Sequence, residues 1–147
     1  MAAQWPLVVA RLNALLPTLS EWSAVTVIDG PLVSVDVPSD YMTVGYVADD
    51  QAGTYNQEQD PNGFQYVETG TIRSQLNCLT GDSDLPSVRT RVFALVDALE
   101  AAVRADRTLG VLSPSGTSEL DVEVLSLSNA NGTAQQLTIT LHYQTVT

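Results

Sequence analysis

The stretch LDVEVLSLSNANGTAQQLTITLHYQ, residues 120–144, decides the fold. Apolar and polar residues alternate on both sides of its central Asn131-Gly132 pair, and a period of two is typical of a strand with one buried face. Asn-Gly between two such strands is a strong signal for a tight hairpin turn. We therefore predict an antiparallel hairpin whose strands cover residues 120–127 and 137–144.

A helix is predicted before this hairpin, over residues 89–106. The loop that precedes it, residues 80–86, contains Asp82, Ser83 and Asp84, whose side chains can cap a helix N-terminus. Apolar residues recur at helical spacing along the helix and form one stripe that can face a core. The stripe consists of Val88, Val92, Leu95, Val96, Leu99 and Val103.

The N-terminal half contains weaker signals for a second helix and four further strands. The helix begins near Pro6, because proline suits the first helical position, and it ends before Pro17. Three short β-rich runs and one long alternating run follow it. We place the short strands at residues 24–28, 32–37 and 41–48, and the long strand at residues 64–79.

The segment before the long strand, residues 49–63, is polar, acidic and without periodicity. We expect an exposed loop, and loops of this length are usually functional or disordered. Two interpretations stay open: a mobile solvated loop, and a segment that orders against a partner with Tyr55 as its anchor. The candidate partner-binding residues are Asp49, Asp50, Tyr55, Glu58 and Asp60.

Together these elements predict a single α+β domain over residues 1–147. The strands are amphipathic rather than apolar throughout, so that one face of the sheet is covered and the other is exposed to solvent. Two helices are enough to cover one of them. We predict a mostly antiparallel sheet with two helices packed on one face.

The composition excludes several classes of protein. The chain has 17 Asp and Glu against 6 basic residues, all Arg, and a net charge of −11, so we do not expect DNA binding, which relies on basic residues. The best apolar run, residues 7–19, is too short to cross a bilayer, and the N-terminus does not resemble a signal peptide. Cys78 is the only cysteine, so no intrachain disulfide can form. We expect a soluble, intracellular protein without membrane contact.

Side chains suited to catalysis or metal binding are few. His142 is the only histidine, and one His with one Cys cannot build a structural zinc site, which needs four ligands. No phosphate-binding loop, nucleophile elbow or metalloprotease helix is present. We therefore expect no metal, no cofactor and no enzyme activity. A less favoured alternative is an enzyme or small-ligand-binding domain that uses His142 and the neighbouring acidic strand.

An acidic row forms the other candidate site. Glu119, Asp121 and Glu123 lie on one face of the first hairpin strand, with neighbours about 7 Å apart. Such a row is most often the solvated face of a strand. It could also bind a cation, act as an acid–base pair or line a channel with negative charge. These interpretations stay open from the residues alone.

The C-terminal block resembles the tail terminator (tail completion) proteins of long-tailed, non-contractile bacteriophages. The arginine-bearing helix, the Arg-Thr-Leu-Gly sequence at 107–110 and the two alternating hairpin strands carry the resemblance. The rest of the chain matches only in layout. Family members often have a second glycine after Leu-Gly, where this chain has Val111.

The resemblance implies a structural virion protein that forms a homohexameric ring on the finished tail tube. Such a ring stops tube polymerisation, binds the major tail tube protein on one face and a head-completion or connector protein on the other, and lets DNA pass without specific binding. It is assembled in the host cytoplasm and lies at the head–tail interface. Glu119, Asp121 and Glu123 would then line its lumen. The alternative is another phage head–tail connector or a tail-tube-related protein.

Overall fold

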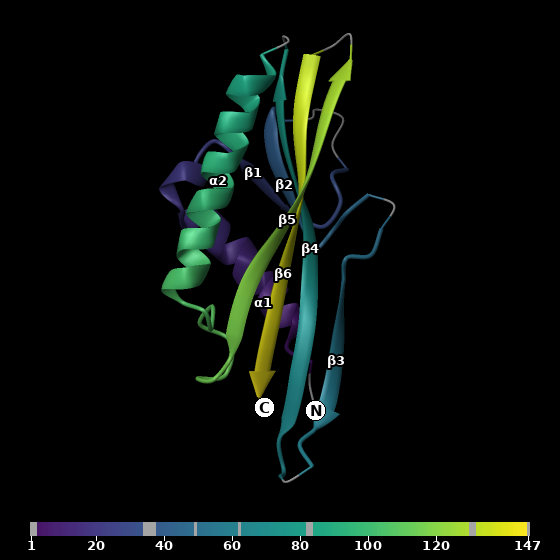
Figure 1. Ribbon diagram of the computed structural model, residues 1–147, viewed down its shortest axis with the longest axis vertical. Coiled ribbons are helices and arrows are strands. Elements are labelled where there is room, and N and C mark those ends of the chain that lie inside the picture. Colours follow the sequence, from purple (N-terminus) through teal and green to yellow (C-terminus); the bar gives the residue numbers. More distant parts are fainter. Residues whose placement is uncertain are drawn as a thin grey trace.

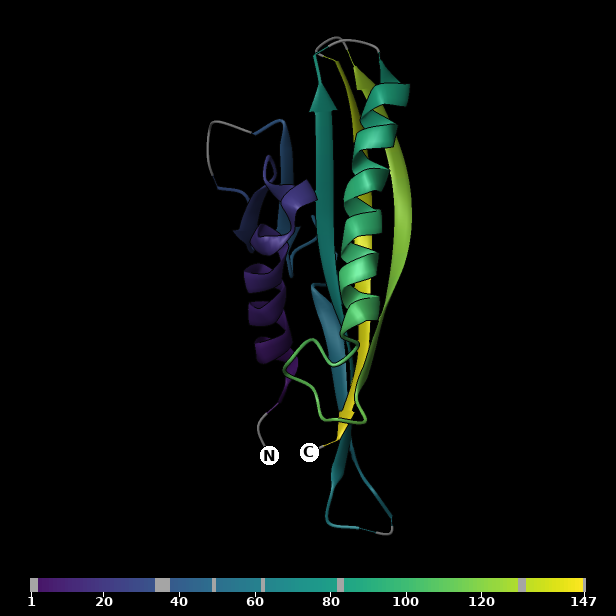
Figure 2. The same cartoon turned by 90° about the vertical axis from the view of Figure 1, so that its left-hand side faces the viewer.

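The fold is a six-stranded sheet with both helices on one face, as Figures 1 and 2 show. It comes from a computed structural model that describes residues 3–33, 38–48, 50–61, 63–81, 84–129 and 132–146, the side chains of residues 127–129 excepted. The elements in chain order are α1 (Trp5–Leu15), two short 3-10 helices (Leu16–Thr18 and Ser20–Trp22), β1 (Thr26–Asp29), β2 (Asp40–Val44), β3 (Gly53–Gln59), β4 (Tyr66–Thr80), α2 (Leu85–Ala105), β5 (Thr117–Asn129) and β6 (Gly132–Val146).

The long strand β4 lies at the centre of the sheet. The strand order is β1-β2-β4-β6-β5, and β3 also pairs with β4. Because β6 pairs with one edge of β4 along nearly its whole length, β2 and β3 share the other edge, one after the other. Only β1 and β2 are parallel. The predicted α+β class, with a mostly antiparallel sheet and two helices on one face, is confirmed.

The predicted hairpin is present as β5 and β6, which pair from Thr117↔Gln144 to Asn129↔Gly132. Burial along β6 alternates residue by residue, as the sequence pattern requires. Gly132 has a positive φ of +134°, and a Cβ there would lie 2.0 Å from the Thr80 carbonyl oxygen. Glycine is therefore needed where β6 begins. Asn131 itself lies outside the described residues.

Both helices pack onto the sheet through one continuous core. Every member of the predicted α2 stripe is buried, and Val8 and Leu12 of α1 are buried beside Leu16 and Trp22. The indole of Trp22 donates a hydrogen bond of 3.0 Å to the backbone oxygen of Leu95, which ties the N-terminal region to α2. No helix in the described part of the chain is long and apolar enough to cross a membrane.

Helix α2 begins at Leu85, four residues before the predicted start, because the cap lies further upstream than the apolar stripe suggests. The carboxylate of Asp84 accepts a hydrogen bond of 3.1 Å from the Ser87 backbone N–H, and Pro86 occupies the first turn, where its missing N–H has no consequence. Asp84 is thus the capping residue. The other two cap candidates, Asp82 and Ser83, lie outside the described residues.

The prediction of one exposed loop over residues 49–63 is wrong, because β3 occupies the middle of that segment. Residues of β3 are mostly exposed on both faces, so that the strand has no apolar alternation to reveal it. It is held instead by backbone pairing with β4, from Gly53↔Ile72 to Gln59↔Tyr66. Polar sequence of this kind forms a strand when a long neighbour offers it a free edge.

Smaller differences affect the other short strands. The strand predicted at residues 41–48 ends at Val44, because Gly45 turns the chain with a φ of +66°. Of the strand predicted at residues 32–37, positions 32 and 33 are not in a strand, and positions 34–37 lie outside the described residues. The strand predicted at residues 24–28 corresponds to β1, which begins two residues later, at Thr26.

Candidate functional site

The acidic row lies on the sheet face that the helices leave uncovered, which we call the outer face. Leu137, Ile139 and Leu141 of β6 are buried towards the helices, so that Thr138, Thr140 and His142 point to the outer face. Directly paired residues share a face, and these three pair with Glu123, Asp121 and Glu119. All three acidic side chains are exposed. The structure thus brings the row together, as the sequence predicted.

His142 is not simply solvated, because it pairs with one member of that row. Its Nε2 lies 2.7 Å from Oδ2 of Asp121, with 40% of the histidine side chain and 76% of the aspartate side chain exposed. A carboxylate beside a histidine can orient the ring, as it does in nucleophilic catalysis. That chemistry also needs a nucleophile, and in the described part of the chain no Ser, Thr or Cys hydrogen-bonds His142.

A shallow hollow of about 440 Å³ opens beside this pair on the sheet. Its walls are mostly hydroxyl and amide side chains from the four strands β3, β4, β5 and β6, with Arg107 from the turn that follows α2. No group of three or more His, Cys, Asp or Glu residues in the described ranges is arranged to hold a metal ion. The residues that line the hollow on the outer face include Thr54, Asn56, Thr69, Thr71, Glu119 and His142.

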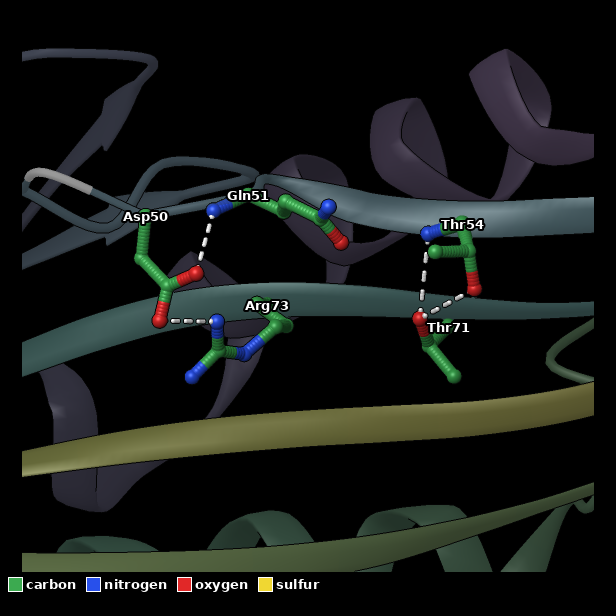
Figure 3. Close-up of polar contacts among 5 residues, drawn as sticks. All are labelled: Asp50, Gln51, Thr54, Thr71 and Arg73. Atoms are coloured by element: carbon green, nitrogen blue, oxygen red, sulfur yellow. Dashed lines mark hydrogen bonds and ion pairs between the residues drawn. The ribbon is translucent and has the colours of Figure 1, made fainter.

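The candidate residues of the 49–63 segment do not form one site. Figure 3 shows Asp50 held on β4 through Arg73, with 2.6 Å between carboxylate and guanidinium. Hydrogen bonds from Arg73 and from the Gln51 backbone N–H hold the pKa of Asp50 below its ordinary value. Thr54 adds two hydrogen bonds to the Thr71 hydroxyl, drawn in the same figure. The start of the 49–63 segment is therefore held on β4 by an ion pair and hydrogen bonds.

The other candidates in that segment point in different directions. Tyr55 pairs with Gly70 and so lies on the helix side of the sheet, where more than half of it stays exposed. Glu58 is on the outer face and accepts a hydrogen bond of 3.0 Å from the Asn56 amide. Asp60 lies beyond the end of β3, and Asp49 is outside the described residues.

A buried carboxylate that the sequence analysis did not single out lies on the helix side. Glu68 is fully buried and accepts hydrogen bonds from the Gln4 backbone N–H, the Gln57 amide and the Tyr143 hydroxyl. Its charge lies at the N-terminus of α1, where the helix dipole favours an anion. Burial, together with the hydrogen bond to Glu68, raises the pKa of Tyr143. This cluster fixes the start of α1 on the sheet.

A second polar cluster joins β2, β4 and α2. The Arg91 guanidinium meets both carboxylate oxygens of Asp40 at 2.9 Å, and it also donates to the Leu79 backbone oxygen. Burial, and after it the charge of Asp40, raises the pKa of the Cys78 thiol to about 12. A thiol that stays protonated is a poor nucleophile and a poor metal ligand. The cluster is therefore structural.

The turn at residues 106–110, which carries much of the family resemblance, is also structural. The Asp106 carboxylate accepts hydrogen bonds from the backbone N–H and the hydroxyl of Thr108. Leu109 then adopts a φ of +55°, unusual for a residue with a Cβ, and its side chain is buried in the core. The Arg11 side chain donates to the Leu109 backbone oxygen at 2.8 Å. The turn thus links α2 to α1.

Comparison with known proteins adds one finding. No protein family and no curated protein matches this chain. A solved structure described as the virion of a native gene transfer agent (GTA) particle is similar to it, at 14% identity and a TM-score of 0.44, with 94% of this chain and 90% of that chain covered. A likeness at this TM-score carries no argument about function, which has to come from the residues of the chain itself.

Proposed function

We propose that this chain is a structural protein of a phage-like virion, a tail terminator that closes into a hexameric ring on the tail tube. The ring stops tube polymerisation, binds the major tail tube protein on one face and binds a head-completion or connector protein on the other. The observation that carries the proposal is the turn at residues 106–110, through which the sequence resembles that family. Its hydrogen bonds and the buried Leu109 give this motif a structural role.

The arrangement of the sheet suits a ring. β3 and β5 lie on opposite edges of the sheet, with β4 and β6 between them. A contact between unlike surfaces on opposite edges repeats in one direction, and it closes into a ring when the rotation fits. One face of a closed ring can then match the tube, while the other offers no surface for further tube subunits.

The charge of the outer face suits a lumen through which DNA passes. Glu119, Asp121 and Glu123 are exposed in one row, and the face around them is hydroxyl-rich rather than apolar. Six copies would carry 6 × −11 = −66 formal charges. Because like charges repel, such a wall limits the adhesion of DNA. We propose that the outer face lines the channel and that DNA is not bound specifically.

We also propose that the protein is not an enzyme. The His142–Asp121 pair is the arrangement closest to a catalytic one, and in the described residues it lacks a hydrogen-bonded nucleophile. His142→Ala and Asp121→Ala should therefore leave assembly of infectious or gene-carrying particles unchanged. A loss of particle function with intact rings would favour the enzyme or ligand-binding alternative.

A capping experiment tests the proposal. Major tail tube protein is polymerised with and without this chain, and the tubes are measured by electron microscopy. We expect tubes of limited length with an extra ring at one end. Tubes of unchanged length without decorated ends would contradict the proposal, and binding along the shaft or at the other end would favour a tail-tube-related or connector role.

A further inference from the structure

Two strands of the sheet have an edge that no other described strand covers. β5 pairs only with β6, and β3 pairs only with β4, among the residues that the structure describes. Between residues 121 and 126 of β5 only Val122 is not exposed, and in β3 only Gly53 and Gln57 are not. An uncovered edge presents a row of unpaired N–H and C=O groups, to which a strand of another chain can add. We call these rows the free edges of β5 and β3.

Sheet edges are usually protected against such pairing by a short strand, a proline or charged side chains. The edge strand β1 is protected in this way, because it has only four residues and is followed by Gly30 and Pro31. β3 has seven residues, no proline and one charged side chain, Glu58. Residues 124–129 of β5 include neither proline nor a charged side chain. Both free edges are therefore suited to bind a strand.

The hairpin shows which residues of β5 point to its free edge. Asn129 and Gly132 lie opposite each other with two residues between them, and the pair that closes such a hairpin is hydrogen-bonded across the strands. Since hydrogen-bonded pairs alternate along a ladder, the odd-numbered residues of β5 bond to β6. Even-numbered residues, Val124 among them, point their N–H and C=O groups to the free edge. Val124 lies opposite Leu137, so its side chain is on the helix side.

The same reasoning applies to β3. The Arg73 backbone N–H donates to the Ala52 oxygen at 2.8 Å, so that even-numbered positions of this segment bond to β4. Tyr55, at an odd-numbered position, therefore points its backbone groups to the free edge. Its side chain is on the helix side, because it lies opposite Gly70.

The two free edges fit each other. β3 and β5 run antiparallel, because each is antiparallel to its neighbour and β4 is antiparallel to β6. A ring whose axis follows the strands keeps these directions from copy to copy. The backbone groups at both free edges belong to residues with side chains on the helix side, and residues opposite each other share a face. Joined copies therefore keep their helices on one side of the sheet and their outer faces on the other.

Exposed side chains at the two edges indicate how the strands align. Val124 is 53% exposed and Tyr55 is 57% exposed, both on the helix side. We propose that β5 of one copy pairs antiparallel with β3 of the next copy, with Val124 opposite Tyr55. An aromatic side chain opposite a β-branched one stabilises a pair of strands. The inference rests on the proposed function, since it names the contact that builds the ring.

This alignment also sets the contacts on the outer face. Asn56 lies opposite Glu123, where the amide can donate to the carboxylate. Glu58 and Asp121 are the one pair of like charges, and the Asp121 carboxylate contacts Nε2 of His142 at 2.7 Å. Two β5 strands paired with each other would instead form a closed dimer and leave β3 unpaired, so that no ring could form.

A disulfide-trapping experiment tests the contact in the full chain. In the proposed alignment Thr54 lies opposite Leu125 in a non-hydrogen-bonded pair, whose Cα atoms are about 4.5 Å apart and thus close enough for a disulfide. We expect mild oxidation of Thr54→Cys/Leu125→Cys, alone or with tail tubes, to give a ladder of covalent oligomers. The two thiols of one chain cannot meet, because β4 and β6 separate them. The native Cys78 is fully buried and does not interfere.

Two controls test the alignment and the identity of the partner strand. Thr54→Cys/Glu123→Cys moves the second thiol by two residues along the same face of β5 and should trap at least about tenfold more slowly, because the Cα atoms are then too far apart for a disulfide. Leu125→Cys alone should give no covalent dimer, because β5 strands do not pair with each other in the ring.

A second variant tests the backbone pairing itself. Val124→Pro removes an N–H that points to the free edge and not to β6, so the fold should persist by circular dichroism. In Thr54→Cys/Leu125→Cys it should slow the trapping by about tenfold or more, since one hydrogen bond between copies is lost and the proline ring obstructs the incoming strand. Val124→Thr keeps the N–H and the branched shape, and as the matched control it should trap at the unaltered rate.

The outcomes separate this inference from the proposed function. Rings that cap tubes while Thr54→Cys/Leu125→Cys traps no faster than the shifted pair would overturn the strand pairing and leave the ring intact. Covalent dimers of Leu125→Cys alone, trapping only to the tube protein, or equal rates for Val124→Pro and Val124→Thr would also overturn it. A chain that stays monomeric, never caps tubes and gives no ladder would contradict both proposals.

Discussion

At the scale of residues, a buried hydrogen-bonded cluster joins β4, β6 and the start of α1. Glu68 is buried, no Arg or His among the described residues forms an ion pair with it, and three donors from three parts of the chain compensate for its lost hydration. One of those donors is Tyr143, whose ring lies over Gly70 on the neighbouring strand. An aromatic that covers a glycine across two strands compensates for the missing side chain.

Gly70→Ala should disrupt this cluster. A Cβ at Gly70 would lie 2.5 Å from the Tyr143 ring, so that the ring must move and strain its hydrogen bond to Glu68. We expect the free energy of unfolding to fall by about 1–3 kcal/mol, as for other overpacked cores. Urea denaturation measures this. Gly81→Ala is the control, because a Cβ there meets nothing within 4 Å; an equal loss in both variants would contradict the account.

The Asp50–Arg73 contact makes a prediction about pH. Since the pKa of Asp50 is lowered in the folded chain, the contact stabilises the fold above the unfolded value of about 3.9 and loses this effect as the pH falls through the folded value. NMR titration should therefore give a higher pKa for Asp50 in Arg73→Gln than in the native chain. An unchanged value would show that Arg73 does not hold this carboxylate.

At the scale of elements, the sequence correctly predicted the helix and the strands that bury one face and expose the other. The alternation in β6 and in the first half of β5, and the stripe of α2, follow from one covered face each, so that the residue pattern alone predicts them. β3 lacks such a pattern because both its faces are mostly exposed, and only the free edge of β4 explains it. The acidic row was predicted from strand spacing. The contact between His142 and Asp121 was not predicted, because the two residues are not directly paired across the hairpin: His142 lies opposite Glu119.

The two buried clusters were missed for a related reason. Glu68 and Asp40 are polar residues whose burial depends on partners distant in sequence, Gln4 and Arg91. Nothing local marks either carboxylate as buried. The one available signal is Gly70 inside a strand, which often indicates a close approach by another group.

The Asp40–Arg91 pair joins β2 to α2, and a substitution there tests that link. Asp40→Asn removes the charge but keeps the shape. We expect a loss of about 1–2 kcal/mol in the free energy of unfolding, a modest value because the Arg91 side chain is 39% exposed. Thermal and urea denaturation measure it. Asp29→Asn, at the exposed end of β1, is the control. A comparable loss of stability in this variant would contradict the claim that the Asp40–Arg91 pair links β2 to α2.

At the scale of the whole molecule, the helices cover one face of the sheet and leave the other face polar and acidic. We expect such a division if the outer face of each subunit lines a channel. Substituting the row with Glu119→Gln, Asp121→Asn and Glu123→Gln should leave folding and ring formation intact, because all three side chains are exposed. DNA should then adhere more strongly to the ring at low salt, since repulsion is reduced.

Co-sedimentation of the ring with linear DNA over a salt series measures that adhesion. The control substitutes three exposed carboxylates on α2, β1 and the second 3-10 helix, Asp97→Asn, Asp29→Asn and Glu21→Gln, which removes the same charge away from the outer face. Equal DNA adhesion in both triple variants would mean that the outer face does not line the channel.

The central claim is that copies of this chain close into a ring, and the mass of the assembled particle tests it most directly. Light scattering on the purified chain, alone and after release from tail tubes, should give a hexamer of 6 × 15.7 kDa, about 94 kDa. A particle of 15.7 kDa under both conditions, with no decoration of tube ends, would contradict it.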